Sequence, residues 1–333
     1  MPSQPVFGGE VMRSSAILVL GCLLSLFGES ALAQGKYVTV GESCGGYSRI
    51  EIGLPKGMCA GLVMQSPGGR GKMGLPRTLV PLAGTGDWLV ADLGGWNVRA
   101  GSIWRLSSVP GQEPKVTRLM TGLEMPHTIL RGPDGRYYVG EMGRIFAFDP
   151  LAADPRKTVT DIVTGLPTNR LHDNRHPLSA FIFASDGALL VNVGAPSDQC
   201  LGKDGKPTGP RCTEGEGSEA AASVRRYAPT GPGQWAKDFT VFASGLRNSM
   251  AFALARDGVL QVENSIDIED PAHPSDEINL LKAGRHYGWP YCVDMKSPAP
   301  GWAGTNAMDC NGGDYTKPVA LLGPHSAPLG MIW

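Results

Sequence analysis

Along most of the chain, short apolar runs of strand length alternate with tight turns. In four places, an apolar run is followed by a turn containing an aspartate and then by a second apolar run. The turn aspartates are Asp87, Asp134, Asp186 and Asp257, and glycine follows the last three. Asp-Gly is typical of two-residue β-hairpins, because the turn positions adopt positive φ. Each unit is therefore predicted to be a strand, a tight turn and a second strand.

The spacing of these units predicts a β-propeller. Successive turn aspartates are 47, 52 and 71 residues apart, which fits one four-stranded blade with its loops. No sustained helical period competes with this pattern. The 46 glycines and 27 prolines among 333 residues agree with an all-β fold of short strands and many turns. A β-sandwich is the structural alternative.

The repeat also predicts where polar side chains meet. In an antiparallel hairpin, the residues before the first strand and after the second lie at the same end. Inner strands of a propeller surround a central channel, so such residues should converge at its mouth. The residues at these positions are His127, His176, Arg247 and Asn248 before first strands, and Asp198 and Asn264 after second strands.

The third unit carries about nine extra residues, because its glycine and turn aspartate are 21 residues apart against 13, 12 and 12 in the others. The insertion contains His172, Asp173, Asn174, Arg175 and His176. A loop rich in titratable groups at a channel mouth is typical of catalytic loops.

The N-terminus has the pattern of a secretory signal. Arg13 precedes a short apolar core at residues 16–27, and Ala31-Leu32-Ala33 forms a cleavage site. Met12 is an alternative start, and Cys22 lies in a weak lipoprotein-like box. We expect a signal peptide at 1–33, a propeller domain at 34–333, and a periplasmic or secreted protein. No other stretch is long enough for stable membrane insertion, and a net charge of −1 gives no reason to expect nucleic acid as a partner.

The six cysteines that remain after signal removal fall into three pairs that are close in sequence. An even number in an exported protein favours disulfides. Proximity predicts the bonds 44–59, 200–212 and 292–310, although six cysteines allow fifteen connectivities. The alternative is a metal or haem site, which the lack of any Cys-x-x-Cys spacing disfavours.

Several motifs resemble those of the glucose/sorbosone dehydrogenase family. The matching segments are 122–150, 176–194, Gly245-Leu246-Arg247-Asn248, Asp276-Glu277-Ile278-Asn279-Leu280, 284–290, which contains Tyr287-Gly288-Trp289-Pro290, and 325–328. The resemblance covers roughly residues 70 to 333. It implies a six-bladed propeller that oxidises a small sugar with pyrroloquinoline quinone (PQQ) and Ca²⁺ and passes electrons to an external acceptor.

The resemblance also implies residue roles. His176 stands where the family has its catalytic base, which would take the proton of the C1 hydroxyl. Arg247 and Asn248 match the family's cofactor-contacting pair, since a guanidinium suits carboxylates. For His176, the alternative is a loop histidine with no function. For Arg247, the alternative is an ion pair that holds two blades together. Asn264 and His127 are further candidates for cofactor contact, and a structural hydrogen bond is the alternative for His127.

The segment Asn264-Ser265-Ile266 matches the loop whose main-chain carbonyls hold the family's calcium, so Ser265 and Ile266 are the metal candidates. Backbone oxygens suit this hard cation. The acidic run that follows, from Asp267 to Glu277, is more typical of a solvated surface, with Asp276 the best candidate to support the loop.

Two departures from the family stand out. The carboxylate that orients the family's histidine falls at Ala195; Asp198, three residues on, is the candidate to replace it, and the alternative is that no carboxylate does. The family's later cofactor-gripping arginines and lysine have no counterpart here. We therefore expect an incomplete propeller of about four blades plus the first strand of a fifth at 327–333. The rival functions are a non-catalytic or inactive truncated propeller, and a lactonase-type calcium-dependent hydrolase.

Overall fold

The computed structural model describes residues 38–65, 72–167 and 176–332. These residues form β-strands and two short 3-10 turns, η1 (Pro155–Thr158) and η2 (Pro300–Trp302), with no α-helix among them. No helix in the described ranges is long and apolar enough to cross a membrane. The proposed signal peptide and the residues 172–175 of the insertion lie outside the described residues.

The first two predicted units each begin a four-stranded antiparallel sheet. Blade 1 has the order β4-β5-β6-β7 and blade 2 the order β8-β9-β10-β11. The strands of blade 1 are β4 (Pro76–Leu82), β5 (Asp87–Asp92), β6 (Gly101–Ser107) and β7 (Lys115–Leu123). Those of blade 2 are β8 (Thr128–Arg131), β9 (Tyr137–Glu141), β10 (Arg144–Phe148) and β11 (Thr160–Val163).

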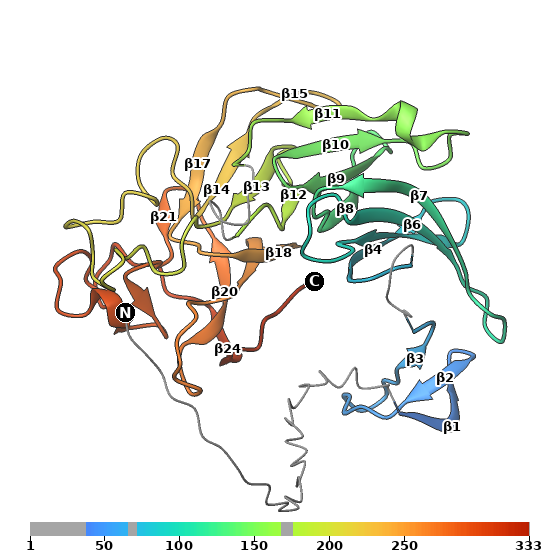
Figure 1. Cartoon of the computed structure of the whole chain (residues 1–333), viewed down its shortest axis with the longest axis horizontal. Helices are drawn as coiled ribbons and strands as arrows, with labels where there is room; N and C mark the ends of the chain where they lie inside the picture. Colours follow the sequence, from blue (N-terminus) through green and yellow to red (C-terminus); the bar gives the residue numbers. More distant parts are fainter. Residues whose placement is uncertain (1–37, 66–71, 168–175, 333) are drawn as a thin grey trace, which may run out of the picture.

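The third and fourth units build two further blades. Blade 3 contains β12 (Phe181–Phe183), β13 (Leu189–Val193), β14 (Ser223–Tyr227), β17 (Thr240–Ser244) and, paired in parallel at its edge, β21 (Arg285–His286). Blade 4 contains β18 (Ser249–Ala255), β19 (Gly258–Glu263), β20 (Ser275–Leu281) and β24 (Ala320–Pro324). Figure 1 shows the four sheets side by side in an arc, which confirms the propeller prediction.

Strand alternation explains how neighbouring blades pack. In β9, Tyr137 and Val139 pack with blade 1, whereas Tyr138 between them packs with blade 3. Side chains on a strand point alternately to the two faces of its sheet. Blades 2 and 3 therefore bury both faces, and one apolar cluster lies between each pair of neighbouring blades.

The inner strands β4, β8, β12 and β18 surround a central cavity of about 400 Å³. The segment after β24 runs to the middle of the arc, and its residues Leu329 to Ile332 line this cavity (Figure 1). Residues 327–332 were expected to begin the inner strand of a fifth blade, and they carry no strand pairing. The described residues offer this segment no neighbouring strand with which to form a ladder.

Loops between the blades form a separate apolar cluster that two disulfides hold together. Cys200–Cys212 and Cys292–Cys310 are both buried in it with Trp289 and Trp302. Together with Cys44–Cys59, they confirm all three pairings expected from the sequence. The cluster also holds Ile266, so these loops support the segment predicted to bind calcium. The short hairpins nearby and on blade 3 are β15 (Pro229–Gly231), β16 (Gln234–Trp235), β22 (Cys292–Val293) and β23 (Ser297–Pro298).

A small sheet precedes the first blade. It consists of β1 (Thr39–Cys44), β2 (Tyr47–Ile50) and β3 (Gly61–Leu62), and the Cys44–Cys59 bond closes it. Tyr47 Oη lies 2.7 Å from Ser108 Oγ, which links this sheet to blade 1.

Candidate functional site

A cavity of about 440 Å³ lies at the channel mouth, on the face opposite the Asp-Gly turns. It is lined by five residues that the sequence singled out: His127, His176, Arg247, Asn248 and Asn264. The first four directly precede β8, β12 or β18 or stand a few residues before them, and Asn264 follows β19. The hairpin geometry therefore brings residues from three blades together. The volume lies in the range of pockets for small molecules and cofactors.

His176 is buried, with 6% of its surface exposed. Its Nδ1 atom lies 2.8 Å from the main-chain oxygen of Ala195. A carbonyl oxygen only accepts hydrogen bonds, so Nδ1 carries the proton and Nε2 keeps the lone pair in the neutral ring. The expectation that Asp198 orients this histidine is wrong, because the main chain of Ala195 does so and the Asp198 carboxylate binds elsewhere.

Gly194 explains how the ring reaches Ala195. A Cβ atom at Gly194 would collide with the main-chain oxygen and the Cβ of His176. Only glycine permits this close approach of the residue after β13 to His176, five residues before β12.

Arg247 is almost fully buried and joins blades 3 and 4. Its Nη2 atom lies 2.5 Å from Asp198 Oδ1 and 2.9 Å from Asp267 Oδ2. Its Nη1 donates to the main-chain oxygens of Asn264, at 3.1 Å, and Ser265. The ion pair between blades, considered as the alternative for this arginine, is therefore present, and it coexists with a place on the cavity wall.

The loop after β19 presents oxygen atoms to Arg247. The carbonyls of Asn264 and Ser265 converge on one guanidinium nitrogen, while the buried Oδ1 of Asn264 has no hydrogen-bond partner among the described residues. Asp276 supports the loop, since its Oδ1 accepts from Ser265 N at 2.8 Å and its Oδ2 from Ala327 N at 2.7 Å. Ser265 and Ile266 line a separate cavity of about 10 Å³ beside Arg247.

Two buried glutamates border that small cavity: Glu277, from the acidic run expected to be solvated, and Glu263, which no sequence motif singled out. Glu263 and Glu277 lie opposite each other in the β19–β20 ladder. Burial raises the pKa of Glu263 to about 8 and the pKa of Glu277 well above its ordinary value. Glu263 also accepts the main-chain N–H of Arg247 at 2.5 Å and thereby fixes the start of β18. The pair is therefore at least partly protonated near neutral pH.

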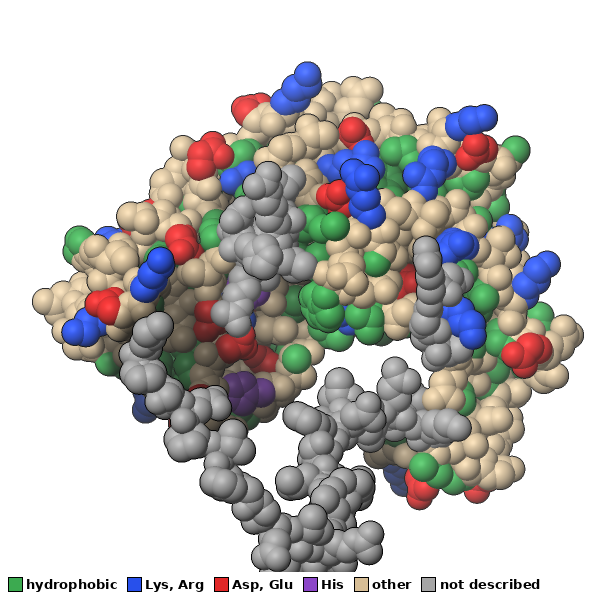
Figure 2. Space-filling view, viewed as in Figure 1, with side chains coloured by type: hydrophobic (Ala, Val, Ile, Leu, Met, Phe, Trp, Pro, Cys, Tyr) green, Lys and Arg blue, Asp and Glu red, His purple; other side chains and the backbone are tan. Residues whose placement is uncertain are grey.

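The acidic run between β19 and β20 divides into two parts. Asp267, Glu269 and Asp270 are exposed, as expected for a solvated surface, whereas Asp276 and Glu277 are buried. Figure 2 shows carboxylate side chains gathered in a hollow on the side of the molecule where β20 and β24 lie.

His127 is buried, and neither ring nitrogen has a hydrogen-bond partner among the described residues. Burial, assisted by the positive charge of Arg77, lowers the pKa of His127 to about 4. The ring is therefore neutral near pH 7 and offers one donor and one acceptor to the cavity.

Arg77 and Trp96 also line the cavity, and the sequence analysis missed both. The signal for Arg77 was present in the repeat, because Arg77 follows Pro76 as His127 follows Pro126. Tyr287 and Trp289, by contrast, are buried packing residues. Trp289 Nε1 donates to the main-chain oxygen of Asp198 at 2.7 Å.

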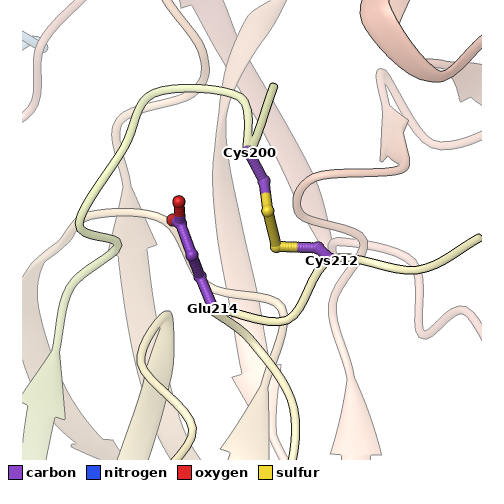
Figure 3. Close-up of side chains that lie close together, drawn as sticks. All are labelled: Cys200, Cys212 and Glu214. Carbon is purple, nitrogen blue, oxygen red and sulfur yellow. A yellow bond between two sulfur atoms is a disulfide. The ribbon is translucent and has the colours of Figure 1, made fainter. Parts of the chain in front are cut away.

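Figure 3 shows the group in the described residues whose side chains are spaced for a metal: Cys200, Cys212 and Glu214. The two sulfur atoms are bonded to each other and so cannot act as thiolate ligands. The Glu214 carboxylate accepts from Ser197 Oγ at 2.8 Å. This group is therefore structural.

Comparisons with known proteins agree with this arrangement. The profile of the family described as Glucose / Sorbosone dehydrogenase matches residues 154–333. No curated protein sequence matches the chain at a significant level.

Among solved structures, a calcium structure of a Trichoderma reesei Carbohydrate-Active Enzymes Family AA12 protein has a TM-score of 0.57 at 20% identity, covering 78% of this chain and 71% of that one. A putative oxidoreductase (glucose dehydrogenase) from Thermus thermophilus has a TM-score of 0.54 at 16% identity, covering 81% of this chain and 76% of that one. The PQQ-bound aldose sugar dehydrogenase of Streptomyces coelicolor has a TM-score of 0.51 at 20% identity, covering 82% of this chain and 75% of that one. At these identities, the likeness concerns the fold.

Proposed function

The chain belongs to the glucose/sorbosone dehydrogenase family, and on this basis we propose that it is an oxidoreductase that oxidises an aldose or sorbosone-like sugar at C1. PQQ and Ca²⁺ are the proposed cofactors, and an external acceptor takes the electrons. The observation that carries the proposal is the buried His176, held in one tautomer by Ala195 on a cavity that it shares with Arg247 and Asn248. We expect the protein to act in the periplasm or outside the cell.

The cavity suits a planar, polar cofactor. Its volume of about 440 Å³ is adequate for a small organic molecule. Buried polar groups normally have hydrogen-bond partners. The ring nitrogens of His127 and the Oδ1 of Asn264 have none among the described residues, so a polar ligand would satisfy them. We assign cofactor contacts to Arg247, Asn248, Asn264 and His127.

The loop after β19 has the donor chemistry of a calcium site. Its available ligands are oxygens: main-chain carbonyls and the Asn264 amide, with the carboxylates of Asp198 and Asp267 nearby. Hard cations prefer such ligands. The guanidinium of Arg247 already donates hydrogen bonds to two of these carbonyls, those of Asn264 and Ser265, and places its positive charge beside them. Calcium binding through the main chain of Ser265 and Ile266 therefore competes with the positive charge of Arg247 for the Ser265 oxygen.

In the proposed reaction, this chain contributes a base and a scaffold. His176 Nε2 accepts the proton of the C1 hydroxyl, and the Nδ1–Ala195 hydrogen bond holds the ring in orientation and stabilises the imidazolium that forms. When bound, PQQ supplies the hydride acceptor, so an aldose loses one hydride and one proton and becomes its lactone. The buried wall of the cavity limits access of water to the base.

The hydrolase alternative requires carboxylates from several blades at the channel centre. Asp267 is the one carboxylate residue among the described residues that line the cavity. The lining is otherwise made of histidine, arginine, amide and apolar groups and Ser179, with no second carboxylate among the described residues, which disfavours that alternative.

The proposal is tested by adding PQQ and Ca²⁺ to the purified protein and following dye-linked oxidation of a broad aldose panel. Oxidation that requires both additions supports the proposal. A non-catalytic propeller predicts no oxidation of any sugar, with or without measurable PQQ binding.

A further inference from the structure

Arg77 is a cation on the cavity wall that no carboxylate of the described residues neutralises through an ion pair. The charge of Asp92 acts on Arg77, but this carboxylate already accepts hydrogen bonds from the main-chain N–H groups of Gly74, Leu75 and Gly94 and from Trp104 Nε1. The Nε atom of Arg77 is buried and has no hydrogen-bond partner in the described part of the chain. A partly buried guanidinium whose Nε–H has no hydrogen-bond partner is costly unless a ligand accepts that hydrogen bond.

Two further groups face the cavity beside Arg77. The guanidinium carbon lies 5.9 Å from the centre of the Trp96 ring, which stands 61% exposed at the rim. The neutral His127 ring brings two nitrogens that lack partners among the described residues. Thr78 Oγ1 donates to the His127 main-chain oxygen at 2.8 Å, so β4 and the start of β8 hold these groups in fixed relation.

The charges of the cavity differ from side to side. Arg247 on blade 4 faces two carboxylates, Asp198 and Asp267, and that group carries a formal charge of −1. An anionic ligand can therefore accept a hydrogen bond from Arg247, whose Nε has no partner among the described residues, but gains no net Coulombic attraction from that group. Arg77, on the opposite side at blade 1, is the positive charge available to it.

We propose that Arg77, together with Trp96 and His127, binds an organic carboxylate in this cavity. A guanidinium pairs with carboxylates through two parallel hydrogen bonds, and a neutral imidazole and an aromatic ring complete the recognition of a ring-shaped acid. The carboxylate has two possible sources, the tricarboxylate cofactor or an acidic sugar such as a uronate. The inference rests on the proposed function in taking this cavity as the site, and Arg77 acts in it as a binding residue.

The test is isothermal titration calorimetry on the full chain with three probes: PQQ, D-glucuronate and D-glucose, in the presence of Ca²⁺. The variant is Arg77→Met, which keeps most of the side-chain volume. The matched control is Arg118→Met, because Arg118 lies 5.4 Å from the ring of Trp104 on the same blade, is exposed, and does not line the cavity. Melting temperatures of both variants check that they are folded.

We expect Arg77→Met to weaken binding of a carboxylate probe about tenfold to a hundredfold, as is typical when a hydrogen bond to a charged group is lost, and to leave D-glucose binding unchanged. Loss for PQQ alone assigns the carboxylate to the cofactor, and loss for D-glucuronate alone assigns it to the sugar. Equal binding of both acids by wild type and Arg77→Met, or no binding of either acid by wild type, overturns the inference. If Arg77→Met still oxidises neutral aldoses, the proposed function stands whatever the titrations show. If the wild-type protein binds D-glucuronate but not PQQ, the proposed PQQ-dependent function is overturned and the inference about Arg77 is not.

Discussion

The main chain of Ala195 connects His176 to Arg247. Its carbonyl oxygen accepts from Nδ1 of His176 at 2.8 Å, and its N–H donates to the main-chain oxygen of Arg247 at 2.7 Å. The proposed base on blade 3 and the arginine that opens blade 4 are thus positioned by one peptide segment. The geometry of the base depends on backbone structure, and no neighbouring carboxylate is needed to fix its tautomer.

The first prediction concerns the base itself. His176→Ala should lower kcat for sugar oxidation by at least about a hundredfold, the usual contribution of a general base, while PQQ affinity stays within a few fold. Steady-state kinetics and a binding titration measure the two quantities. His273→Ala is the control, because His273 is exposed and pairs with Asp294 outside the cavity. Full activity in His176→Ala would refute the assignment of the base.

The second prediction concerns the approach of β13 to His176. Gly194→Ala should displace His176, because the added Cβ collides with its main chain. We expect kcat to fall more than tenfold, with a clear loss of stability. Gly209→Ala is the control, since a Cβ there meets its nearest neighbour at 3.7 Å. Unchanged kinetics in Gly194→Ala would show that the ring does not need this backbone position.

The third prediction concerns the ion pair between blades 3 and 4. Asp198→Ala should lower the free energy of unfolding by about 3–5 kcal/mol, because it leaves the buried Arg247 with one fewer carboxylate. Asp186→Ala, which breaks the exposed pair with Arg226, should cost about 0–1 kcal/mol. Urea unfolding of both variants measures the difference. Equal effects would show that the Arg247 pair contributes no more than a surface contact.

The fourth prediction concerns pH. Burial raises the pKa of Glu263 to about 8 in the folded protein, against an ordinary value of 4.5. The folded state therefore binds the Glu263 proton more tightly than the unfolded state does. The resulting stabilisation of the folded state is complete below pH 4.5 and is lost as pH rises through 8. Glu263→Gln should flatten the decline of stability between pH 5 and 8, by up to about 1.4 kcal/mol per pH unit. Glu269→Gln, at an exposed position, should leave the slope unchanged, and a similar slope in Glu263→Gln would contradict the assignment.

Local sequence features predicted the fold well. The Asp-Gly turns and their spacing predicted the four blades, because a hairpin is specified by its own turn residues and by strand alternation. Proximity predicted the three disulfides, since each one closes a loop of 12 to 18 residues within one local segment. The segment 327–332 was less predictable, because a strand forms only where a partner strand is available.

The candidate site was harder to predict for specific physical reasons. The hairpin rule brought His127, His176, Arg247 and Asn264 to one cavity, as expected. It could not identify the carbonyl of Ala195 as the partner of His176, because main-chain acceptors have no signature in sequence. Arg77 was missed because the first unit carries arginine where the second carries histidine.

Burial explains the remaining misses. Glu277 looked like part of a solvated acidic surface and Glu263 matched no motif, yet the register of β19 and β20 turns both toward the protein interior. The preference of Asp198 for Arg247 over His176 depends on how blades 3 and 4 pack against each other, which no local pattern encodes.

The most direct test of the account is a single-turnover measurement on protein loaded with PQQ and Ca²⁺, mixed without external acceptor with an aldose that it binds. The account predicts one lactone formed per bound PQQ in the wild-type protein and slow or no formation in His176→Ala at equal PQQ occupancy. Recovery of unchanged aldose from fully loaded wild-type protein would contradict it.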